Sequence, residues 1–338
     1  MNKKGFTLVE VIMTVGILSI VIPILTLLFI SMNKSFVTFE AFNSMKKVNQ
    51  ETINRIYIRL GRNKRLFQEK AEDIAFLNVI DLTDCPSVLS GSKLPVIRQS
   101  GSLSPSSTTF DGTTFGNSLF FTYNIMPAIL ENIVTDASGT KTQSVRIDLY
   151  RFIYYYLTSD DSPLILNKQT YKLVEWESNK YADCNQLEDI SNPIKKPNTI
   201  AALVNEGVSY CFASSMSDVA LSFYNLTISA GEGVKTLDAV HAISKNKHKV
   251  LTKITTGLMM GSYRYGIAPN TSDMGSVQHP VPAYAVESGN FPSGFEIGIS
   301  GLSAGREVLV RHVLMANTSV GSLLTYPMSI ISSSRDIW

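Results

Sequence analysis

A single long apolar run near the N-terminus constrains this chain more than any other feature. Residues 6–30 read FTLVEVIMTVGILSIVIPILTLLFI and contain one charge, Glu10. As an α-helix rising ~1.5 Å per residue, the run is about 37 Å long, which exceeds the roughly 30 Å of a bilayer's hydrocarbon core. No later segment is as long without charges. The run therefore predicts one membrane-spanning helix at the start of the chain.

The charges beside this run predict its orientation. Lys3 and Lys4 precede it, and basic residues mark the cytoplasmic side of a membrane span. We therefore expect a cytoplasmic N-terminus and an exported C-terminal part. The whole chain has 30 Lys and Arg against 28 Asp and Glu, a formal charge of +2 that these two lysines account for. Nucleic acid is not indicated as a partner, because the remainder has no basic surplus.

A cleaved secretory signal peptide is the first alternative to a lasting anchor. Such a peptide has an apolar core of roughly 7–15 residues followed by a small-x-small cleavage site. The run here is longer, and Ile30-Ser31-Met32-Asn33 is a poor cleavage site. A carboxylate at Glu10 is also out of place, because a charge inside the span costs about 2.5–3.5 kcal/mol. An intramembrane charge of this kind indicates a function.

Lys3-Lys4-Gly5-Phe6-Thr7-Leu8-Val9-Glu10 resembles the class III leader and cleavage site of type IV pilins and type II secretion pseudopilins. The resemblance implies that a prepilin peptidase cuts between Gly5 and Phe6 and then methylates the new amine of Phe6. It also implies that Glu10 pairs with the N-terminal amine of a neighbouring subunit during assembly. Such pairing would make a buried carboxylate tolerable. The resemblance covers roughly the first 35 residues, and the alternative is an ordinary signal anchor with a chance similarity.

The same resemblance implies a location and a set of partners. The expected partners are a prepilin peptidase, other pilins or pseudopilins, and the assembly platform of the inner membrane. The chain is expected in the inner membrane and then in a pilus or a pseudopilus. Its size and three loose matches further along resemble the larger minor pilins and J-type minor pseudopilins; these are Tyr150-Arg151-Phe152, Leu173-Val174-Glu175-Trp176 and Leu203-Val204-Asn205-Glu206-Gly207-Val208. The sequence leaves surface pilus and secretion machine both open.

The chain divides into a leader, a two-part helix and a globular remainder. The expected segments are the leader at 1–5, the spanning half of the helix at 6–30, an amphipathic extension at 31–65 and the exported domain at 66–338. Gly16 and Pro23 predict a bend within the span, because proline removes a backbone donor.

The extension is expected to lay one apolar face on the exported domain. Apolar residues recur there at three-residue steps, and Gly61 is the expected helix end; the apolar residues are Phe36, Phe39, Phe42, Met45 and Val48. The basic residues 62–65 are expected to be a solvated helix terminus.

Alternating and aromatic segments predict that the globular part consists mainly of strands. The clearest covers residues 144–157, which alternate at first and then become apolar on both faces; residues 171–176 are its expected partner. Further expected strands lie at 120–123, 219–228, 249–256, 295–299 and 307–315, with a short helix at 200–206. The predicted fold class is α+β, a long N-terminal helix packed on an antiparallel sheet.

Motifs that resemble catalytic or metal sites have simpler explanations. Gly301-Leu302-Ser303-Ala304-Gly305 matches the G-x-S-x-G nucleophile elbow, but a strand-like segment follows it where the elbow needs a helix, so a hairpin turn is expected. The four histidines lack metal-ligand spacing. We therefore expect no catalytic residue, no metal and no cofactor.

Two groups of side chains bear on the state of the exported domain. Its three cysteines are Cys85, Cys184 and Cys211, and Cys184–Cys211 is the candidate disulfide because the loop between them is short. Other pairings and a fully reduced state stay open. The aromatic strand at 150–156 is expected to pack against the N-terminal helix rather than to stack on sugars or bases.

These features favour a non-enzymatic structural subunit of a filament. The alternative is an exported enzyme, or an adhesive or DNA-binding tip protein, on a membrane anchor that only resembles a pilin's.

Overall fold

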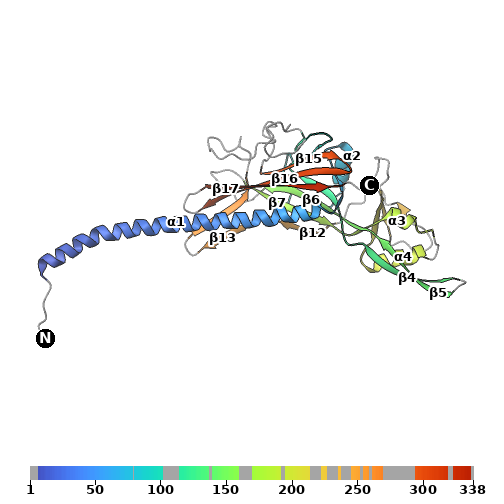
Figure 1. Cartoon of the computed structure of the whole chain (residues 1–338), viewed down its shortest axis with the longest axis horizontal. Coiled ribbons are helices and arrows are strands. Elements are labelled where there is room, and N and C mark those ends of the chain that lie inside the picture. The colour runs from blue at the N-terminus through green and yellow to red at the C-terminus, as the bar shows by residue number, and fades with distance from the viewer. Residues whose placement is uncertain are drawn as a thin grey trace.

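The computed structural model describes most of the chain after the leader. The described residues are 7–78, 80–101, 114–136, 139–159, 170–191, 195–213, 222–226, 235–236, 245–251, 254–258, 261–268, 294–318 and 323–335. Figure 1 shows one long helix that extends far beyond a sheet-rich body, with the N-terminus at its outer end. The predicted α+β class is therefore confirmed.

The described residues contain a dominant helix and three short ones: α1 (Leu8–Leu60), α2 (Ala71–Leu77), α3 (Cys184–Glu188) and α4 (Lys195–Asn205). Strands in the first part of the body are β1 (Asn63–Leu66), β2 (Ile97–Arg98), β3 (Leu119–Asn124), β4 (Ala128–Asp136), β5 (Gly139–Ile147), β6 (Leu149–Ser159), β7 (Tyr171–Ser178), β8 (Tyr181–Asp183) and β9 (Tyr210–Ala213). The later strands are β10 (Ser222–Asn225), β11 (Lys235–Thr236), β12 (Lys245–Val250), β13 (Ile254–Leu258), β14 (Gly261–Ile267), β15 (Phe295–Leu302), β16 (Gly305–Thr318) and β17 (Leu323–Ser334).

Helix α1 is continuous from the apolar run into the globular body. It passes through Gly16 and Pro23 without a break, and Figure 1 shows its N-terminal end curving gently. Ser19 lies four residues before Pro23. Its hydroxyl donates a hydrogen bond to the carbonyl of Gly16 at 2.7 Å. A sharper bend at these two positions stays a prediction.

The second half of α1 packs on the sheet with only part of the face that was expected. Met45 and Val48 are buried as expected. Phe36, Phe39 and Phe42 are exposed by 55%, 65% and 39%, whereas Val37 and Ala41 are fully buried. The expectation is wrong for Phe36 and Phe39, because a step of three residues turns an α-helix by about 300° and successive members move around the helix. Phe42 still contacts the sheet, with its ring centroid 5.2 Å from that of Tyr326 in β17. The buried face instead combines one step of three with steps of four, which keeps its members on one side of the helix; they are Ala41, Met45, Val48, Thr52, Ile56 and Leu60.

The helix ends at Leu60, with Gly61 as its C-cap as expected, rather than at residue 65. Lys64 and Arg65 lie in β1, which pairs with β3. Arg65 forms an ion pair with Asp73 at 2.9 Å, and Lys64 lies 3.9 Å from Asp148. The basic stretch therefore contains a strand held by acidic partners, and the expectation of a solvated helix terminus is wrong.

The strands form one large mixed sheet and one separate hairpin. The main order is β11-β10-β9-β8-β6-β7-β14-β16-β15-β2, with β1 beside β3, β3 beside β6, β12 beside β7, β13 beside β14 and β17 beside β16. Most neighbours are antiparallel, but β8–β9 and β15–β2 are parallel, which corrects the purely antiparallel expectation.

The segment expected as one strand at 144–157 is divided at Asp148. Residues before it belong to β5, which pairs with β4, and residues after it belong to β6, which pairs with β3 and β7. The backbone N–H of Asp148 donates to the side chain of Gln186 at 2.7 Å, and its carbonyl accepts from Asp183 at 3.1 Å. Bonds to the α3 region thus replace ladder bonds at this residue and let the chain change sheets. The expected pairing of 171–176 with this strand is confirmed.

Strand β6 separates two hydrophobic layers. Ile153, Tyr155 and Leu157 belong to the core cluster that includes α1, β15 and β16. Phe152, Tyr154 and Tyr156 point to the other face, where Trp176 and the phenylalanines around α2 form a second cluster. The aromatic strand is therefore a packing element whose rings are inaccessible to sugars and bases. The expected packing on the α1 side is confirmed for Tyr155 and is wrong for Phe152, Tyr154 and Tyr156, which lie in the other cluster.

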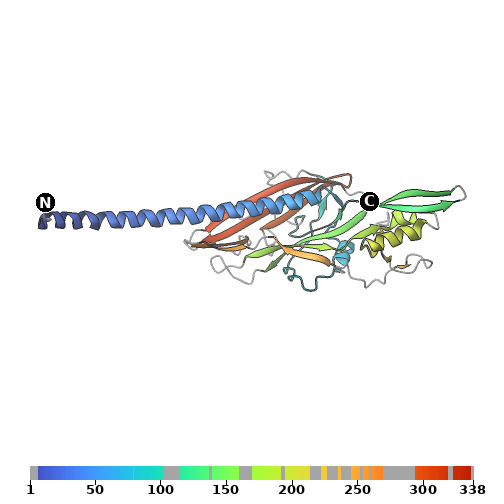
Figure 2. The same ribbon diagram turned by 90° about the horizontal axis from the view of Figure 1, so that it is seen from below.

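A distal lobe lies at the end of the body away from the N-terminus. It contains α3, α4 and the β4–β5 hairpin, which projects outward in Figures 1 and 2. Cys184 and Cys211 form a disulfide in its core, with their Cα atoms 5.2 Å apart. The candidate disulfide is thus present. Cys85 is a half-buried thiol outside this disulfide.

Candidate functional site: the exposed helix and its anchorage

The first half of α1 is an apolar surface with nothing packed on it among the described residues. α1 contains a window with a mean hydropathy of 2.7 that is 0% buried, long and apolar enough to cross a membrane. Large side chains are exposed all round the helix, including Leu8 at 76%, Leu27 at 68% and Phe29 at 67%. A helix that is apolar on every side needs an apolar environment, which a bilayer or neighbouring helices can supply.

Glu10 caps the start of this helix. Its carboxylate accepts hydrogen bonds from the backbone N–H and the hydroxyl of Thr7, both at 2.9 Å, and the Thr7 hydroxyl accepts from the N–H of Glu10 at 3.4 Å. This reciprocal arrangement is a capping box, which satisfies two backbone donors that a helix start leaves open. The predicted cleavage site between Gly5 and Phe6 lies outside the described residues.

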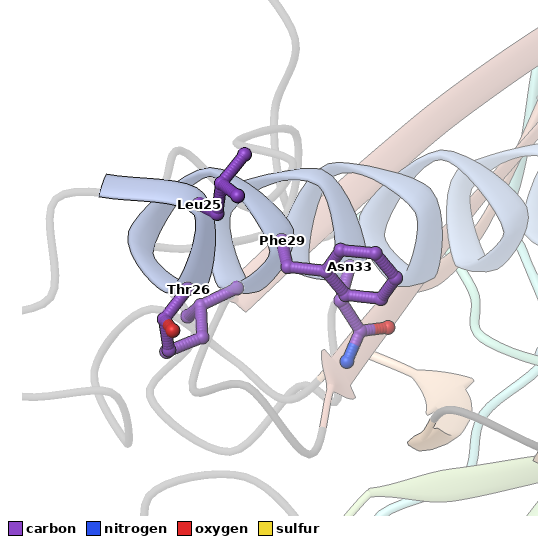
Figure 3. A pocket seen from close by; sticks show the side chains of 5 residues that line it. Leu25, Thr26, Phe29 and Asn33 are labelled. Carbon is purple, nitrogen blue, oxygen red and sulfur yellow. The ribbon is translucent and has the colours of Figure 1, made fainter. Parts of the chain in front are cut away.

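A groove follows α1 near the end of the predicted span. Figure 3 shows Leu25, Phe29 and Asn33 on successive turns, with Thr26 beside them. The described part of its wall consists of α1 side chains only, and the cavity measures about 430 Å³. The groove thus belongs to the mainly apolar surface of the helix and offers mainly apolar contacts.

Two arginines attach the other half of α1 to the sheet. Arg55 donates twice to the carboxylate of Glu175, with both distances 2.6 Å, and Arg59 donates to Glu177 at 3.1 Å. Arg59 also lies 3.4 Å from Glu175. Because a guanidinium fork fits a carboxylate in one orientation, these contacts fix the helix in rotation and translation on β7.

Neighbouring strands complete this ion-pair network. Arg151 of β6 forms an ion pair with Glu177, and the hydroxyl of Tyr155 donates to Glu175 at 2.9 Å. Burial raises the pKa of Glu175, but the hydrogen bonds from Arg55 and the charge of Arg59 outweigh it and hold that pKa below its usual value. Burial raises the pKa of Tyr155 well above its usual value. The tyrosine is therefore a neutral donor and the glutamate an ionised acceptor.

A second polar contact fixes the middle of α1. The side-chain amide of Asn49 donates to the carbonyls of His312 and Tyr326, at 3.2 and 3.0 Å. Its oxygen lies 2.7 Å from Nδ1 of His312. Both side chains are fully buried, and burial lowers the pKa of His312 to about 3. The imidazole is therefore neutral and, with Nδ1 as the donor, completes a bridge between α1, β16 and β17.

Sequence reasoning missed this anchorage, although part of its signal is visible. Glu175 and Glu177 share a strand face with Leu173, so two carboxylates stand on a face that the apolar pattern assigns to the core. Their arginines are one helical turn apart in the printed sequence. What no spacing reveals is that these positions, about 120 residues apart, come together.

The other chemical motifs have structural explanations. Gly301–Gly305 forms the tip of the β15–β16 hairpin, with Ser303 and Ala304 as the turn, as expected. His312 lies in the strand after it and is committed to Asn49. Across the described ranges, no group of three or more His, Cys, Asp or Glu residues could hold a metal ion.

Comparison with known proteins bears on the N-terminal segment. Residues 1–22 match the family model described as the prokaryotic N-terminal methylation motif. The chain carries a class III prepilin leader. No match was found among curated proteins or among solved structures. The matched segment covers the leader and the first turns of α1.

The prepilin leader joins directly to the exposed apolar helix. The leader indicates a subunit similar to type IV pilins and pseudopilins. Such a leader implies processing by a prepilin peptidase and assembly with other pilins. The leader and helix together fit an inner-membrane anchor with an exported C-terminal domain. In such a protein α1 is the assembly surface, and the Arg55–Glu175 network holds that surface to the domain it carries.

Proposed function

We propose that the chain is a minor structural subunit of a type IV pilus or a type II secretion pseudopilus. In this proposal the peptidase cuts between Gly5 and Phe6 on the cytoplasmic side and methylates Phe6. The subunit then leaves the inner membrane through the packing of α1 among other subunits. The observation that carries the proposal is the continuity of a methylation motif at residues 1–22 with a helix whose apolar half is wholly exposed.

The shape of the exported domain supports a minor subunit. The distal lobe and the β4–β5 hairpin extend past the body at the end opposite the N-terminus (Figures 1 and 2). In a filament of parallel subunits, the next subunit occupies the space beyond that end. A projecting lobe is therefore easiest to accommodate at the tip, where nothing lies beyond it.

A structural rather than an enzymatic role belongs to the same proposal. The G-x-S-x-G motif is the tip of a hairpin, and the histidine downstream of it is buried against α1. Polar side chains with strong mutual interactions are Arg55, Glu175 and Glu177, and they join the helix to the sheet. This arrangement supports transmission of mechanical load from α1 to the domain.

Glu10 has a specific place in the proposed assembly. In the isolated subunit its carboxylate caps α1 through Thr7. Cleavage creates a positive amine on Phe6. We expect the amine of a neighbouring subunit to form an ion pair with Glu10, which then no longer caps α1 through Thr7. An ion pair inside the apolar filament would then set the register of the incoming helix.

The test of processing is mass spectrometry of the native N-terminus. We expect a chain that begins with N-methyl-Phe at residue 6 and lacks residues 1–5. An intact Met1 in the mature protein would refute the proposal. Quantitative proteomics of purified filaments then tests the minor role, with an expected copy number far below that of the principal subunit.

The test of assembly compares Glu10→Ala with Glu40→Ala, a control on α1 outside the predicted span. We expect Glu10→Ala to be cleaved normally but depleted from filaments, and Glu40→Ala to be incorporated like the unmodified chain. If Glu10→Ala entered filaments as well as the control, the pairing role of Glu10 would be wrong.

A further inference from the structure

A cleft of about 360 Å³ lies at the tip of the β15–β16 hairpin, away from the assembly helix. The hairpin tip supplies Leu302, Ser303 and Arg306 to one wall. The opposite wall comes from β2 and its neighbour Gln99, and from Gln68 and Lys70 before α2. Its volume is at the low end of the roughly 300–1,000 Å³ of small-molecule sites, so it suits a ligand of about one ring.

The charge of the cleft has one sign. Lys70 and Arg306 line it, and no carboxylate is among its described lining residues. Two acidic residues near Lys70 in sequence have other partners: Glu69 accepts from the N–H of Leu94 at 2.6 Å, and Asp73 accepts from Arg65 at 2.9 Å. Glu307 follows Arg306 in β16, where successive side chains point to opposite faces. Two cations on a cleft wall attract an anion and raise its local concentration.

Neutral donors stand beside these cations. The side-chain oxygen of Gln68 accepts from the N–H of Ile97 at 3.2 Å, which leaves the –NH₂ end of that amide as its donor. Gln99 and Ser303 lie at the exposed rim. Amides and hydroxyls of this kind suit the hydroxyl groups of a sugar.

An apolar wall completes the cleft. It is formed by Val96, Ile97 and Leu302. Leu302 is 65% exposed, and only three other large apolar side chains outside α1 are exposed in the described part of the chain. A leucine held beside cations and amides suits the C–H face of a polyhydroxylated ring.

Backbone geometry fixes the position of this wall. Gly301 has φ +105°, and a Cβ on it would lie 2.6 Å from the carbonyl oxygen of Gly305. Only glycine adopts this conformation readily. Gly301 therefore shapes the hairpin tip and sets Leu302 and Ser303 at the mouth of the cleft.

We propose that this cleft binds one carboxylate-bearing sugar ring, such as a uronic acid. Lys70 and Arg306 take the carboxylate, the amides of Gln68 and Gln99 take hydroxyls, and Leu302 covers the C–H face. The ring can come from a free sugar acid or from a unit of an acidic polysaccharide. The site is independent of helix assembly, because it lies on the exported domain.

The test uses the full chain purified in mild detergent and isothermal titration with galacturonic acid, its trimer and neutral maltotriose. We expect saturable binding of both acidic ligands and none of maltotriose. The monomer and the trimer should bind within about tenfold of each other, because the site holds one ring. A larger gain for the trimer would overturn the one-ring site and indicate a polymer surface instead.

Matched variants locate the site. Lys70→Gln and Arg306→Gln should each weaken binding about tenfold, since each removes one charged contact. Lys47→Gln, which removes an exposed charge from α1, should bind like the unmodified chain. Lys70 is exposed, so its variant keeps the fold and stays informative even if Arg306→Gln unfolds. Absence of saturable binding, equal binding of maltotriose, or unchanged binding by Lys70→Gln would each overturn the proposal.

Discussion

The buried imidazole of His312 makes the stability of the sheet-rich domain depend on pH, and the size of the effect follows from its pKa. Its side chain is fully buried and its pKa is lowered to about 3, against an ordinary value of 6.5. Between these two values the unfolded chain binds a proton that the native chain does not. A group with a depressed histidine pKa therefore removes stability as the pH falls below 6.5.

The magnitude follows from the two pKa values. Each pH unit below the unfolded value costs about 1.4 kcal/mol, so lowering the pH from 7 to 5 costs about 2 kcal/mol through this one group. The native imidazole stays neutral throughout that interval, because pH 5 is well above its pKa of about 3. The loss would reach about 4 kcal/mol at pH 3, where the native imidazole is itself half protonated.

The perturbation is His312→Gln, which removes the titrating group and retains an amide that can bind Asn49. Unfolding by urea is followed at several pH values through the fluorescence of Trp176, which is fully buried. The contribution of His312 is the difference between the pH dependences of the two proteins. We expect the free energy of unfolding to fall by about 2 kcal/mol more in the unmodified protein between pH 7 and pH 5. Parallel curves would refute the reasoning, because they would mean that the native imidazole takes up the proton.

Three further substitutions test separate parts of the structure. Glu175→Gln should lower the free energy of unfolding by about 3 kcal/mol, because it leaves two arginines against the sheet without their shared carboxylate; urea unfolding measures this loss. Cys184→Ser should cost about 3.5 kcal/mol, since it opens a loop with a sequence separation of 27, and proteolysis should then cut the distal lobe first. Gly116→Ala should cost about 3 kcal/mol, because a Cβ there would lie 2.4 Å from the backbone nitrogen of Pro95; thermal unfolding measures the change.

Each of these substitutions has a control in the same chain. Glu51→Gln removes an exposed carboxylate from α1, and Cys85→Ser removes the thiol outside the disulfide. Gly305→Ala adds a Cβ where nothing lies within 4 Å. The control variants should unfold within about 0.5 kcal/mol of the unmodified protein. A substitution that matched its control would show that the contact assigned to it carries no stability.

Sequence alone identified the leader and the character of the long helix. The run at residues 6–30 depends on composition and length, which are local properties, and the motif at residues 1–22 depends on fixed spacing. The hairpin at Gly301–Gly305 and the pairing of residues 171–176 with the aromatic strand were also predictable. Turn chemistry and short-range alternation carry these signals within a few tens of residues.

Tertiary structure decided which face of α1 is buried and what holds it there. Three-residue spacing made Phe36 and Phe39 look like core residues, but the sheet selects the face that contains Ala41 and Met45. The same limit applies to Asp148, where bonds to the α3 region divide a strand that alternation alone extends.

The anchorage itself joins residues that are far apart in the chain. Arg55 meets Glu175, and Asn49 meets His312 at a sequence separation of 263. The sequence by itself determined a prepilin leader and an apolar helix long enough to span a membrane. Only the fold decided how that helix is attached to the sheet-rich domain, because burial and ion pairing depend on contacts between distant segments that no local pattern encodes.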